Sequence, residues 1–295
     1  MMFAPFQYQE LIERALQEDL GTGDLSSAIF PKTAKTHAKI YAKQKGIACG
    51  LEITKQVFKT VDPELEVSIS KADGELVERG TVVMEITGAI CSILSAERTA
   101  LNFLQHLSGV ATATFEAVTE CYGLPTRITD TRKTIPGLRM LQKYAVAMGG
   151  GQNHRFGLYD AVMLKDNHIA AAGGIRPAVA AARSRIGHMV KIEVECENLE
   201  QVQEAVAAGA EVIMLDNMNL ETMGKAVEIV QGRAVVEASG GIRKGDLRAV
   251  AETGVDVISM GAITHSVQAM DFSLDIGDIK ALTKERWEKG ENCAK

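Results

Sequence analysis

Four apolar stretches recur in the second half of the chain: VKIEVEC (190–196), EVIMLDN (211–217), AVVEASGG (234–241) and DVISMGA (256–262). Their first residues are 21, 23 and 22 positions apart. Short apolar strands at this spacing, separated by helical segments, predict βα units in a parallel sheet. The stretch from about residue 107 to 271 has room for roughly seven such units. We therefore predict an α/β fold whose main part is an incomplete α/β barrel of about six to seven strands.

The segments between these strands carry apolar residues at helical spacing and end on glycines placed to terminate helices, namely Gly209, Gly232 and Gly254. Functional residues of α/β barrels lie at the carboxyl ends of the strands. Here this rule selects Glu195, Asp216, Ser239, Gly240, Gly241, Ser259, Met260 and Gly261.

The sequence upstream has a different pattern. Residues 64–88, ELEVSISKADGELVERGTVVMEITG, alternate apolar and polar residues around two turn signals, which predicts antiparallel strands in a separate open sheet. A helical stretch, SILSAERTALNFLQHL (92–107), follows. We predict an N-terminal open-faced α+β sandwich domain (1–106), the barrel domain (107–271) and a C-terminal helical segment (272–295) that packs on the first domain.

Composition limits the function classes. The chain has 295 residues, 46% of them hydrophobic, and a net charge of −6, which disfavours general binding of nucleic acid or an anionic membrane. Its five cysteines show no C-x-x-C spacing, so neither a disulfide framework nor a structural zinc site is indicated. The N-terminus lacks the pattern of a signal peptide. We expect a soluble cytoplasmic protein.

Positive charge is concentrated between residues 127 and 165. Seven cationic residues stand there against two acidic ones: Arg127, Arg132, Lys133, Arg139, Lys143, Arg155 and Lys165 against Asp130 and Asp160. A positive cluster in an acidic protein favours a pocket for a small, multiply charged anion, although solvated surface charges are the simpler alternative.

The stretch DTRKTIPG (130–137) precedes a predicted helix that has Pro136 near its first position. Arg132 and Lys133 would then lie at the positive end of a helix dipole, an unfavourable position unless an anion binds there. GGGQNHR (149–155) adds His154 and Arg155 after a flexible loop, and the strand in AVMLKDNHI (161–169) ends near Lys165. Lys165 could be a Schiff-base nucleophile or an anion ligand; the neighbouring cations favour the ligand.

Glu195 and Asp216 end successive strands and should be neighbours at the mouth of the barrel. They suit ribose hydroxyls, Mg²⁺ or the stabilisation of positive charge on a sugar, but they could also be caps of the next helices. The turns SGG (239–241) and SMG (259–261) lie where barrel enzymes bind a phosphate group. A site for an acid beside a site for a phosphorylated sugar suggests group transfer at an anomeric carbon.

The motifs DTRKTIPGLR, GGGQNHR, LKDNHI, KIEVE, MLDN, EASGGI and SMGAITHS, with EDLGTGDLSS and ERTALNFLQHLSGVAT, resemble the quinolinate phosphoribosyltransferase family from about Glu18 to His265. The resemblance implies condensation of quinolinate with phosphoribosyl pyrophosphate, in the presence of Mg²⁺, to nicotinate mononucleotide, pyrophosphate and CO₂ in NAD biosynthesis. No organic cofactor is implied.

The resemblance also implies roles for individual residues. Binding of the quinolinate carboxylates and of pyrophosphate falls to Thr131, Arg132, Lys133, His154, Arg155 and Lys165. Glu195 and Asp216 correspond to acids at the ribose hydroxyls and the metal, and the SGG and SMG turns to the 5′-phosphate site. Catalysis would depend on Lys133, Lys165, Glu195 and Asp216. Whether Arg132 and Lys133 serve the dicarboxylate or pyrophosphate stays open.

Arg98 corresponds to an arginine that family dimers insert into the neighbouring active site, so a homodimer or a dimer-based hexamer is implied. Its spacing from Leu94 and Leu101 predicts a half-buried side chain at the edge of an apolar helix face, where an ion pair with Glu97 is the alternative role. Two other functions compete with the transferase: a nucleic-acid surface, which the lack of interleaved aromatic residues disfavours, and a Schiff-base aldolase that uses Lys165.

Overall fold

The computed structural model describes residues 8–31 and 33–277. The chain forms two compact units, one made of residues up to 112 together with those from 268 onward, the other of residues 113–267. The long helix α3 (Ile90–Glu120) contributes to both, and the predicted boundary at 106/107 also falls within this helix.

The first unit is built around a four-stranded antiparallel sheet with the order β12-β1-β5-β3. Its elements are α1 (Gln9–Leu20), a short 3₁₀ turn (Ser27–Ile29), β1 (Lys35–Ala42), β2 (Gly46–Ile47), α2 (Leu51–Val61), β3 (Glu66–Ile69), β4 (Leu76–Val77), β5 (Val82–Ala89) and β12 (Phe272–Ile276). Along β1, Ala38, Ile40 and Ala42 are fully buried, whereas Lys39 between them is exposed. One face of the sheet therefore packs on the core, and the other carries polar residues and stays open.

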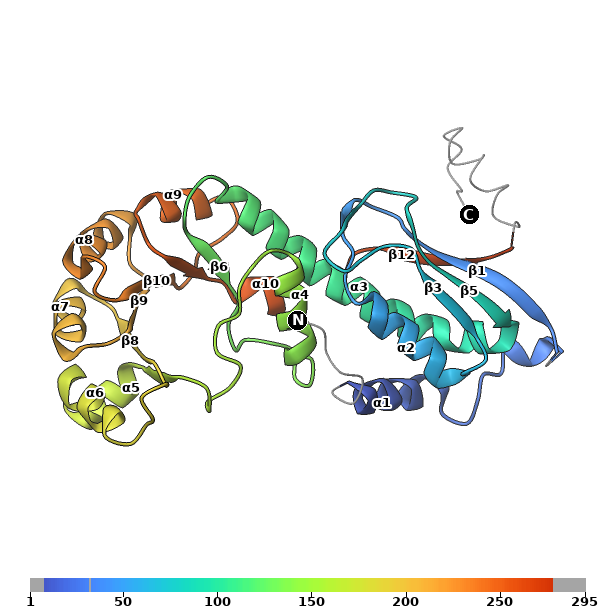
Figure 1. The fold of residues 1–295 in the computed structure, drawn as a ribbon, viewed down its shortest axis with the longest axis horizontal. Coiled ribbons are helices and arrows are strands. Elements are labelled where there is room, and N and C mark those ends of the chain that lie inside the picture. Colours follow the sequence, from blue (N-terminus) through green and yellow to red (C-terminus); the bar gives the residue numbers. More distant parts are fainter. Residues whose placement is uncertain (1–7, 32, 278–295) are drawn as a thin grey trace. The chain divides into compact units, whose positions relative to one another are not determined.

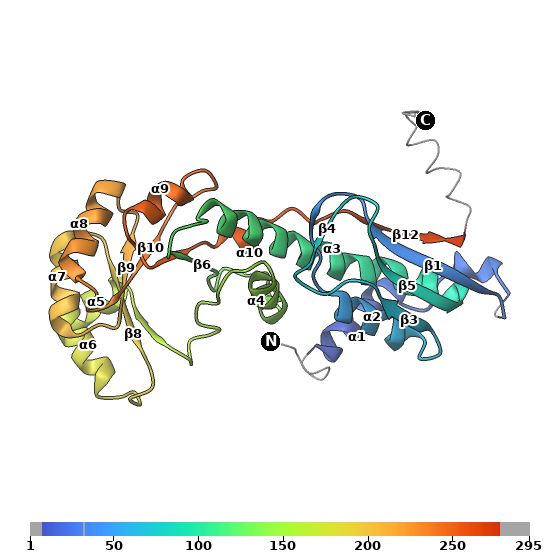
Figure 2. The same ribbon diagram turned by 45° about the horizontal axis from the view of Figure 1, so that its top comes forward.

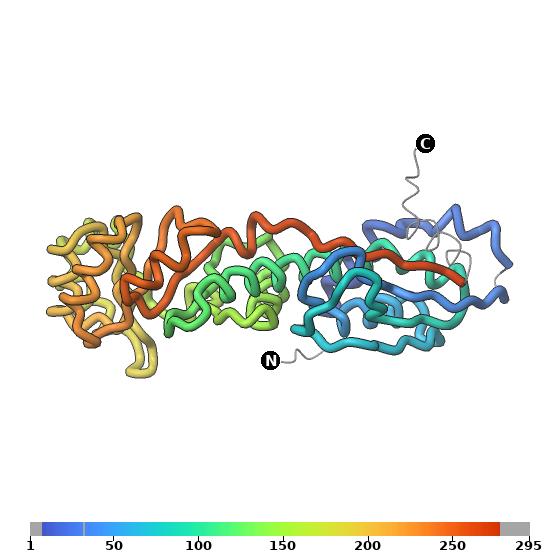
Figure 3. Tube along the Cα trace, turned by 90° about the horizontal axis from the view of Figure 1, so that it is seen from above, coloured from blue at the N-terminus to red at the C-terminus, as the bar shows by residue number. Residues whose placement is uncertain are grey.

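The prediction of a helical segment from residue 272 is wrong for its first five residues. Residues 272–276 form β12, which pairs antiparallel with β1 from Ala42↔Phe272 to Ala38↔Ile276 (Figure 3). The physical reason is that β1 offers an edge on which FSLDI can pair while it buries Phe272 and Leu274 on one face. Residues 278–295, which the prediction also covered, lie outside the described residues.

The second unit confirms the predicted α/β class. Its six-stranded parallel sheet has the order β6-β11-β10-β9-β8-β7, with helices along its outer side (Figures 1 and 2). The elements are β6 (Arg127–Thr129), α4 (Arg139–Met148), β7 (Val162–Leu164), α5 (Asp166–Ala172), α6 (Ile175–Arg183), β8 (Ile192–Cys196), α7 (Leu199–Ala208), β9 (Val212–Asp216), α8 (Leu220–Val230), β10 (Val235–Ser239), α9 (Leu247–Glu252), β11 (Val257–Ser259) and α10 (Ala262–His265).

The barrel is incomplete because the segment between β6 and β7 contains no full strand. There the chain makes a single bridge, from Gln152 to Thr129, on the edge of β6 that β11 does not occupy. The four predicted repeat strands are β8 to β11. Gly209, Gly232 and Gly254 all adopt positive φ at or just after the ends of α7, α8 and α9, a conformation that glycine reaches without steric cost.

Helix α3 is 31 residues long and leaves Arg98 exposed, so the predicted half-burial of this side chain is wrong. None of the helices in the described part of the chain has both the length and the apolar composition needed to cross a membrane.

The return of the chain to the first unit depends on Gly109 of α3. A Cβ atom at this position would lie 2.3 Å from the carbonyl oxygen of Gln268, well inside van der Waals contact. Close by, the N–H of Met270 donates to the carbonyl oxygen of Gln105 at 2.9 Å, and the Gln105 side chain donates to the carbonyl oxygen of Phe272 at 3.0 Å. These contacts place β12 beside β1.

We expect Gly109→Ala to lower the free energy of unfolding by at least about 1–3 kcal/mol, because the new methyl group forces backbone to shift. Gly224→Ala is the matched control: it lies inside α8 with open space around its Cβ position and should gain up to about 1 kcal/mol from helix propensity. Urea unfolding of both variants measures the difference. Equal effects of the two substitutions would contradict the role of Gly109.

Candidate active site

A buried ion pair connects the two cationic motifs. Asp130 follows β6 directly, Lys143 lies in α4, and both side chains are fully buried in contact with each other. Asp130 also accepts hydrogen bonds from Asn153 Nδ2 (2.6 Å) and from the N–H of His154 (2.9 Å), while Lys143 Nζ donates to the carbonyl oxygen of His154 (2.9 Å). Burial raises the pKa of Asp130 and lowers that of Lys143, and their mutual hydrogen bond opposes both shifts.

This pair corrects the interpretation of the positive cluster. Lys143 and Asp130 neutralise each other inside the unit, so neither is available to a ligand. Their function is structural: they hold the GGGQNHR segment against the end of β6, from which the DTRK loop departs.

Arg139 is a second cation with a local function. It is the first residue of α4, and its guanidinium donates to Thr134 Oγ1 (3.0 Å) and to the carbonyl oxygens of Phe156 (3.0 Å) and Arg132 (3.3 Å). The helix thus begins three residues after Pro136, not at the proline. A turn over residues 135–138 precedes it, because the N–H of Leu138 donates to the carbonyl oxygen of Ile135.

Lys133 of the DTRK loop lies against the SMG turn. Thr264 Oγ1 donates to its carbonyl oxygen (2.8 Å), and Gln142 of α4, which is fully buried, donates to the carbonyl oxygen of Thr264 (2.7 Å). A Cβ atom on Gly261 would be 3.1 Å from Lys133 Cδ, so the aliphatic stem of the lysine runs along this glycine. The structure therefore brings together a predicted anion ligand and a predicted phosphate turn.

The two phosphate turns are themselves in contact. Ser239 and Ser259 end β10 and β11, and their hydroxyl oxygens are 3.1 Å apart. Gly240 adopts φ +91°, and a Cβ atom there would lie 2.9 Å from the backbone nitrogen of Asn217, which itself donates to the carbonyl oxygen of Ser239 (3.0 Å). Only glycine lets the SGG turn approach the end of β9 this closely.

Lys165 follows β7 directly, and its Nζ is 2.6 Å from Glu195 Oε2 on the adjacent strand β8. On the next strand, β9, Met214 pairs with Glu195. Asp216 is the last residue of β9, two residues after Met214, and its side chain therefore points to the same face of the sheet. Glu195 and Asp216 thus lie on neighbouring strands, as predicted, and Lys165 follows the strand on the other side of β8. Glu195 occupies the Nζ atom of Lys165, whereas a Schiff-base nucleophile must present a free amine.

The helix-cap alternative for the two acids does not hold. Asn198 caps α7 by accepting a hydrogen bond from the N–H of Gln201, and Asn219 caps α8 in the same way from Thr222. Glu195 and Asp216 lie before these caps, at the strand ends. Within the described residues, Asp216 contacts Asn217, whose amide donates to Asp216 Oδ2 at 2.7 Å.

The predicted ligands Arg132 and Arg155 are both partly buried. Burial lowers the pKa of Arg155, and the charge of Arg132 adds to this shift. Arg155 donates to the carbonyl oxygen of Ala161 (3.0 Å) and contacts the sulfur of Met163 (3.4 Å), beside β7. The Nε of Arg132 is buried without a hydrogen-bond partner among the described residues. A buried cationic nitrogen without a partner favours an anion beside it.

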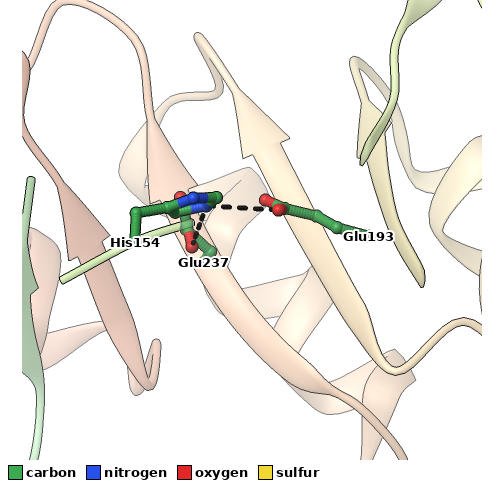
Figure 4. Close-up of side chains that lie close together, drawn as sticks. All are labelled: His154, Glu193 and Glu237. Carbon is green, nitrogen blue, oxygen red and sulfur yellow. Dashed lines mark ion pairs between the residues drawn. The ribbon is translucent and has the colours of Figure 1, made fainter. Parts of the chain in front are cut away.

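Sequence analysis missed two acids inside the sheet. Glu193 of β8 and Glu237 of β10 are buried, and their Oε2 atoms are 3.2 and 3.5 Å from His154 Nε2 (Figure 4). The signal was present, because each glutamate interrupts an apolar run in mid-strand, VKI-E-V and AVV-E-A. Burial raises the pKa of Glu193.

His154 is held by both ring nitrogens. Burial opposes its charged form, but hydrogen bonds to Glu193 and Glu237 outweigh burial and raise the pKa of His154 to about 10. A pKa this high corresponds to a ring with a proton on each nitrogen, but Nδ1 accepts the N–H of Arg155 at 2.8 Å and cannot hold a proton while this hydrogen bond exists. The hydrogen bond is the direct geometric observation, and it requires a bare Nδ1. The ring therefore carries its proton on Nε2 and directs it at the two acids.

Of the remaining predicted residues, Thr131 stabilises its own loop by accepting the N–H of Lys133 at 3.0 Å. Met260 is buried, and its N–H donates to the carbonyl oxygen of Thr129. Arg98 belongs to the first unit.

Comparisons with known proteins identify the family of the chain. The model of the quinolinate phosphoribosyl transferase C-terminal domain matches residues 110–275, and that of the N-terminal domain matches residues 24–108. The chain belongs to the quinolinate phosphoribosyltransferase family. It is 47% identical over 270 residues to the probable nicotinate-nucleotide pyrophosphorylase [carboxylating] of Bacillus subtilis, which covers 92% of this chain and 93% of the relative.

Solved structures of family members have the same fold. NadC from Streptococcus pyogenes superposes with a TM-score of 0.91 at 41% identity, over 94% of this chain and 99% of the other. The nicotinate-nucleotide pyrophosphorylase from Francisella tularensis gives a TM-score of 0.91 at 40% identity, over 94% and 98% of the two chains.

We expect Lys143→Met to lower the free energy of unfolding by about 3–5 kcal/mol, because it leaves the buried Asp130 carboxylate without its counter-charge. Lys225→Met removes the exposed partner of Glu221 and should leave the stability almost unchanged, because water screens this surface pair. Denaturant unfolding compares the two variants. A loss below about 1 kcal/mol for Lys143→Met would show that the buried pair is not a main support of the site.

Proposed function

We propose that the chain catalyses the transfer of the phosphoribosyl group from phosphoribosyl pyrophosphate to quinolinate. The products are nicotinate mononucleotide, pyrophosphate and CO₂, and one proton is consumed at the ring carbon that loses its carboxylate. The observation that carries this conclusion is the contact of Lys133 with the SMG turn, because it joins a cationic site for acids to a turn suited to a sugar phosphate.

The cationic half consists of Arg132, Lys133, Arg155 and Lys165. Lys133 lies beside the SMG turn that follows β11, the second strand in the sheet order, whereas Arg155 donates to Ala161 just before β7, the last strand in that order. We therefore assign Lys133 to the phosphate-bearing substrate and Arg155 to the quinolinate carboxylates. Arginine suits this second task, since its planar fork binds a carboxylate through two parallel hydrogen bonds.

Glu195 and Asp216 serve the sugar. As pyrophosphate leaves, positive charge develops on the ribose, and two carboxylates at the strand ends stabilise it while they bind the ribose hydroxyls. The pyridine nitrogen then attacks the anomeric carbon. The cationic ring so formed accepts the electron pair released when the neighbouring carboxylate leaves as CO₂, so the chain's task in this step is to orient the ring.

The two acids also suit Mg²⁺. This ion is held in enzymes by one or two carboxylates together with substrate phosphates and water. Glu195 uses one oxygen for Lys165, and Asp216 contacts only Asn217 among the described hydrogen bonds, which leaves carboxylate oxygens available. Glu195 and Asp216 would hold the ion, which would neutralise charge on the leaving pyrophosphate.

We further propose a homodimer, alone or within a dimer-based hexamer, in which Arg98 reaches the active site of the neighbouring subunit. Its exposure on α3 is compatible with this role. The ribose 5′-phosphate is assigned to Ser239, Gly240, Gly241, Ser259, Met260 and Gly261, and a cytoplasmic location stays a prediction.

We expect Lys133→Ala and Arg155→Ala to abolish CO₂ release from quinolinate plus phosphoribosyl pyrophosphate, a loss on the order of 10³-fold, because each removes a charge that meets a substrate anion. Release of ¹⁴CO₂ from carboxyl-labelled quinolinate measures it. Arg127→Ala is the matched control. This exposed arginine of the cationic stretch is the first residue of β6, so it lies at the amino end of the strand, whereas the proposed site lies at the carboxyl ends. Absence of both CO₂ and pyrophosphate release by the wild-type protein with Mg²⁺ would refute the function.

Treatment with a chelator should stop pyrophosphate release, and added Mg²⁺ should restore it. With Asp216→Asn, the concentration of Mg²⁺ needed for half-maximal rate should rise, because a charged oxygen ligand is lost. Unchanged turnover after complete removal of divalent ions would contradict the magnesium assignment.

A further inference from the structure

Two acids lie where the proposed function has no direct use for them. Glu193 and Glu237 keep only 6% and 4% of their side-chain surface exposed, close to a site that must attract anions. The Oε1 atom of each is buried and has no hydrogen-bond partner among the described residues. Burying two carboxylates is costly, so their presence beside an anion site requires a compensating role.

The contacts show a chain that leads to Arg155. Oε2 of each acid faces Nε2 of His154, at 3.2 and 3.5 Å (Figure 4). On the other side of the ring, Nδ1 accepts the backbone N–H of Arg155 at 2.8 Å. Because an imidazole ring is rigid, fixing Nε2 between two acceptors also fixes the position of Nδ1, and with it the backbone from which the Arg155 side chain departs.

A metal ion is the alternative explanation, since one ligand atom from each of His154, Glu193 and Glu237 lies within 4.8 Å of the others. A histidine that binds metal through one ring nitrogen donates the N–H of its other nitrogen to an acceptor. Here the other nitrogen, Nδ1, faces an N–H donor. The proton must then be on Nε2, which is the atom that a metal would need, so the geometry favours a hydrogen-bonded cluster.

We propose that Glu193 and Glu237 are positioning residues for the binding of quinolinate. They hold the Nε2–H tautomer of His154, and His154 in turn holds Arg155 where its guanidinium meets a substrate carboxylate. The substrate in this statement rests on the proposed function. Neither glutamate touches the substrate in this role, and the sugar-phosphate turns on β10 and β11 do not depend on it.

The role requires a hydrogen-bond acceptor more than a charge. A glutamine side chain still offers a carbonyl oxygen to Nε2–H, whereas leucine offers no acceptor. We therefore expect Glu193→Gln and Glu237→Gln to keep the KM for quinolinate within about threefold of wild type. Glu193→Leu and Glu237→Leu should raise it on the order of tenfold to hundredfold, as misplaced binding groups do. The KM for phosphoribosyl pyrophosphate should change much less in all four.

The matched control is Glu85→Leu. Glu85 also faces a histidine ring, with its Oε2 at 3.5 Å from His37 Nε2, but on the open face of the antiparallel sheet in the first unit. The Glu85→Leu variant should keep the wild-type KM values for quinolinate and for phosphoribosyl pyrophosphate. If Glu193→Leu and Glu237→Leu raised both KM values equally, or lowered only the yield of folded protein, the positioning role would be refuted in favour of a structural one.

A second measurement does not depend on activity. In ¹⁵N spectra of histidine-labelled protein, His154 should show the Nε2–H tautomer in the wild type and both glutamine variants, and should lose it in the leucine variants. An unchanged tautomer in the leucine variants would overturn the proposal. If wild-type protein released no CO₂ from quinolinate, the proposed function would fail, and the spectra alone would decide whether the two acids position His154.

Discussion

The buried ion pair between Asp130 and Lys143 is the interaction on which the site depends. It joins the end of β6, helix α4 and the GGGQNHR segment at one point, since Asp130 also accepts from Asn153 and the His154 N–H, and Lys143 donates to the His154 carbonyl. Every hydrogen bond here involves a charged partner in a dry environment, where a missing partner is expensive. The arrangement of the two cationic motifs is therefore strongly specified.

The cationic residues around this ion pair have two different roles. Lys143 and Arg139 are committed to backbone and side-chain partners within the second unit. Arg132, in contrast, keeps a buried Nε atom without a hydrogen-bond partner among the described residues. Some cations of the stretch therefore stabilise the unit, and the proposed function assigns the others to substrate anions.

The sequence predicted the parallel repeat, the glycines after its helices and the placement of Glu195 and Asp216, because these are local patterns that repeat at a fixed spacing. The predictions from sequence were wrong where contacts with residues distant in the sequence decide the secondary structure or the exposure of a side chain. Residues 272–276 are a strand because β1 offers them an edge, and α4 begins at Arg139 because a turn and its own side chain organise the preceding residues. The exposure of Arg98 likewise follows from how α3 packs.

By itself, the sequence determined the fold class, the family motifs and the kinds of chemical group present, since hydrophobic periodicity and residue identity require no partner. Only the tertiary structure decided which charges are neutralised by a neighbour. Lys143 and Arg155 look alike in the sequence, yet one is paired with Asp130 in the interior and the other is only partly buried beside β7. Likewise Glu193 and Glu195 are two residues apart on one strand, but one contacts His154 and the other Lys165. The physical reason is that the charge environment of a side chain is set by neighbours that are distant in the sequence.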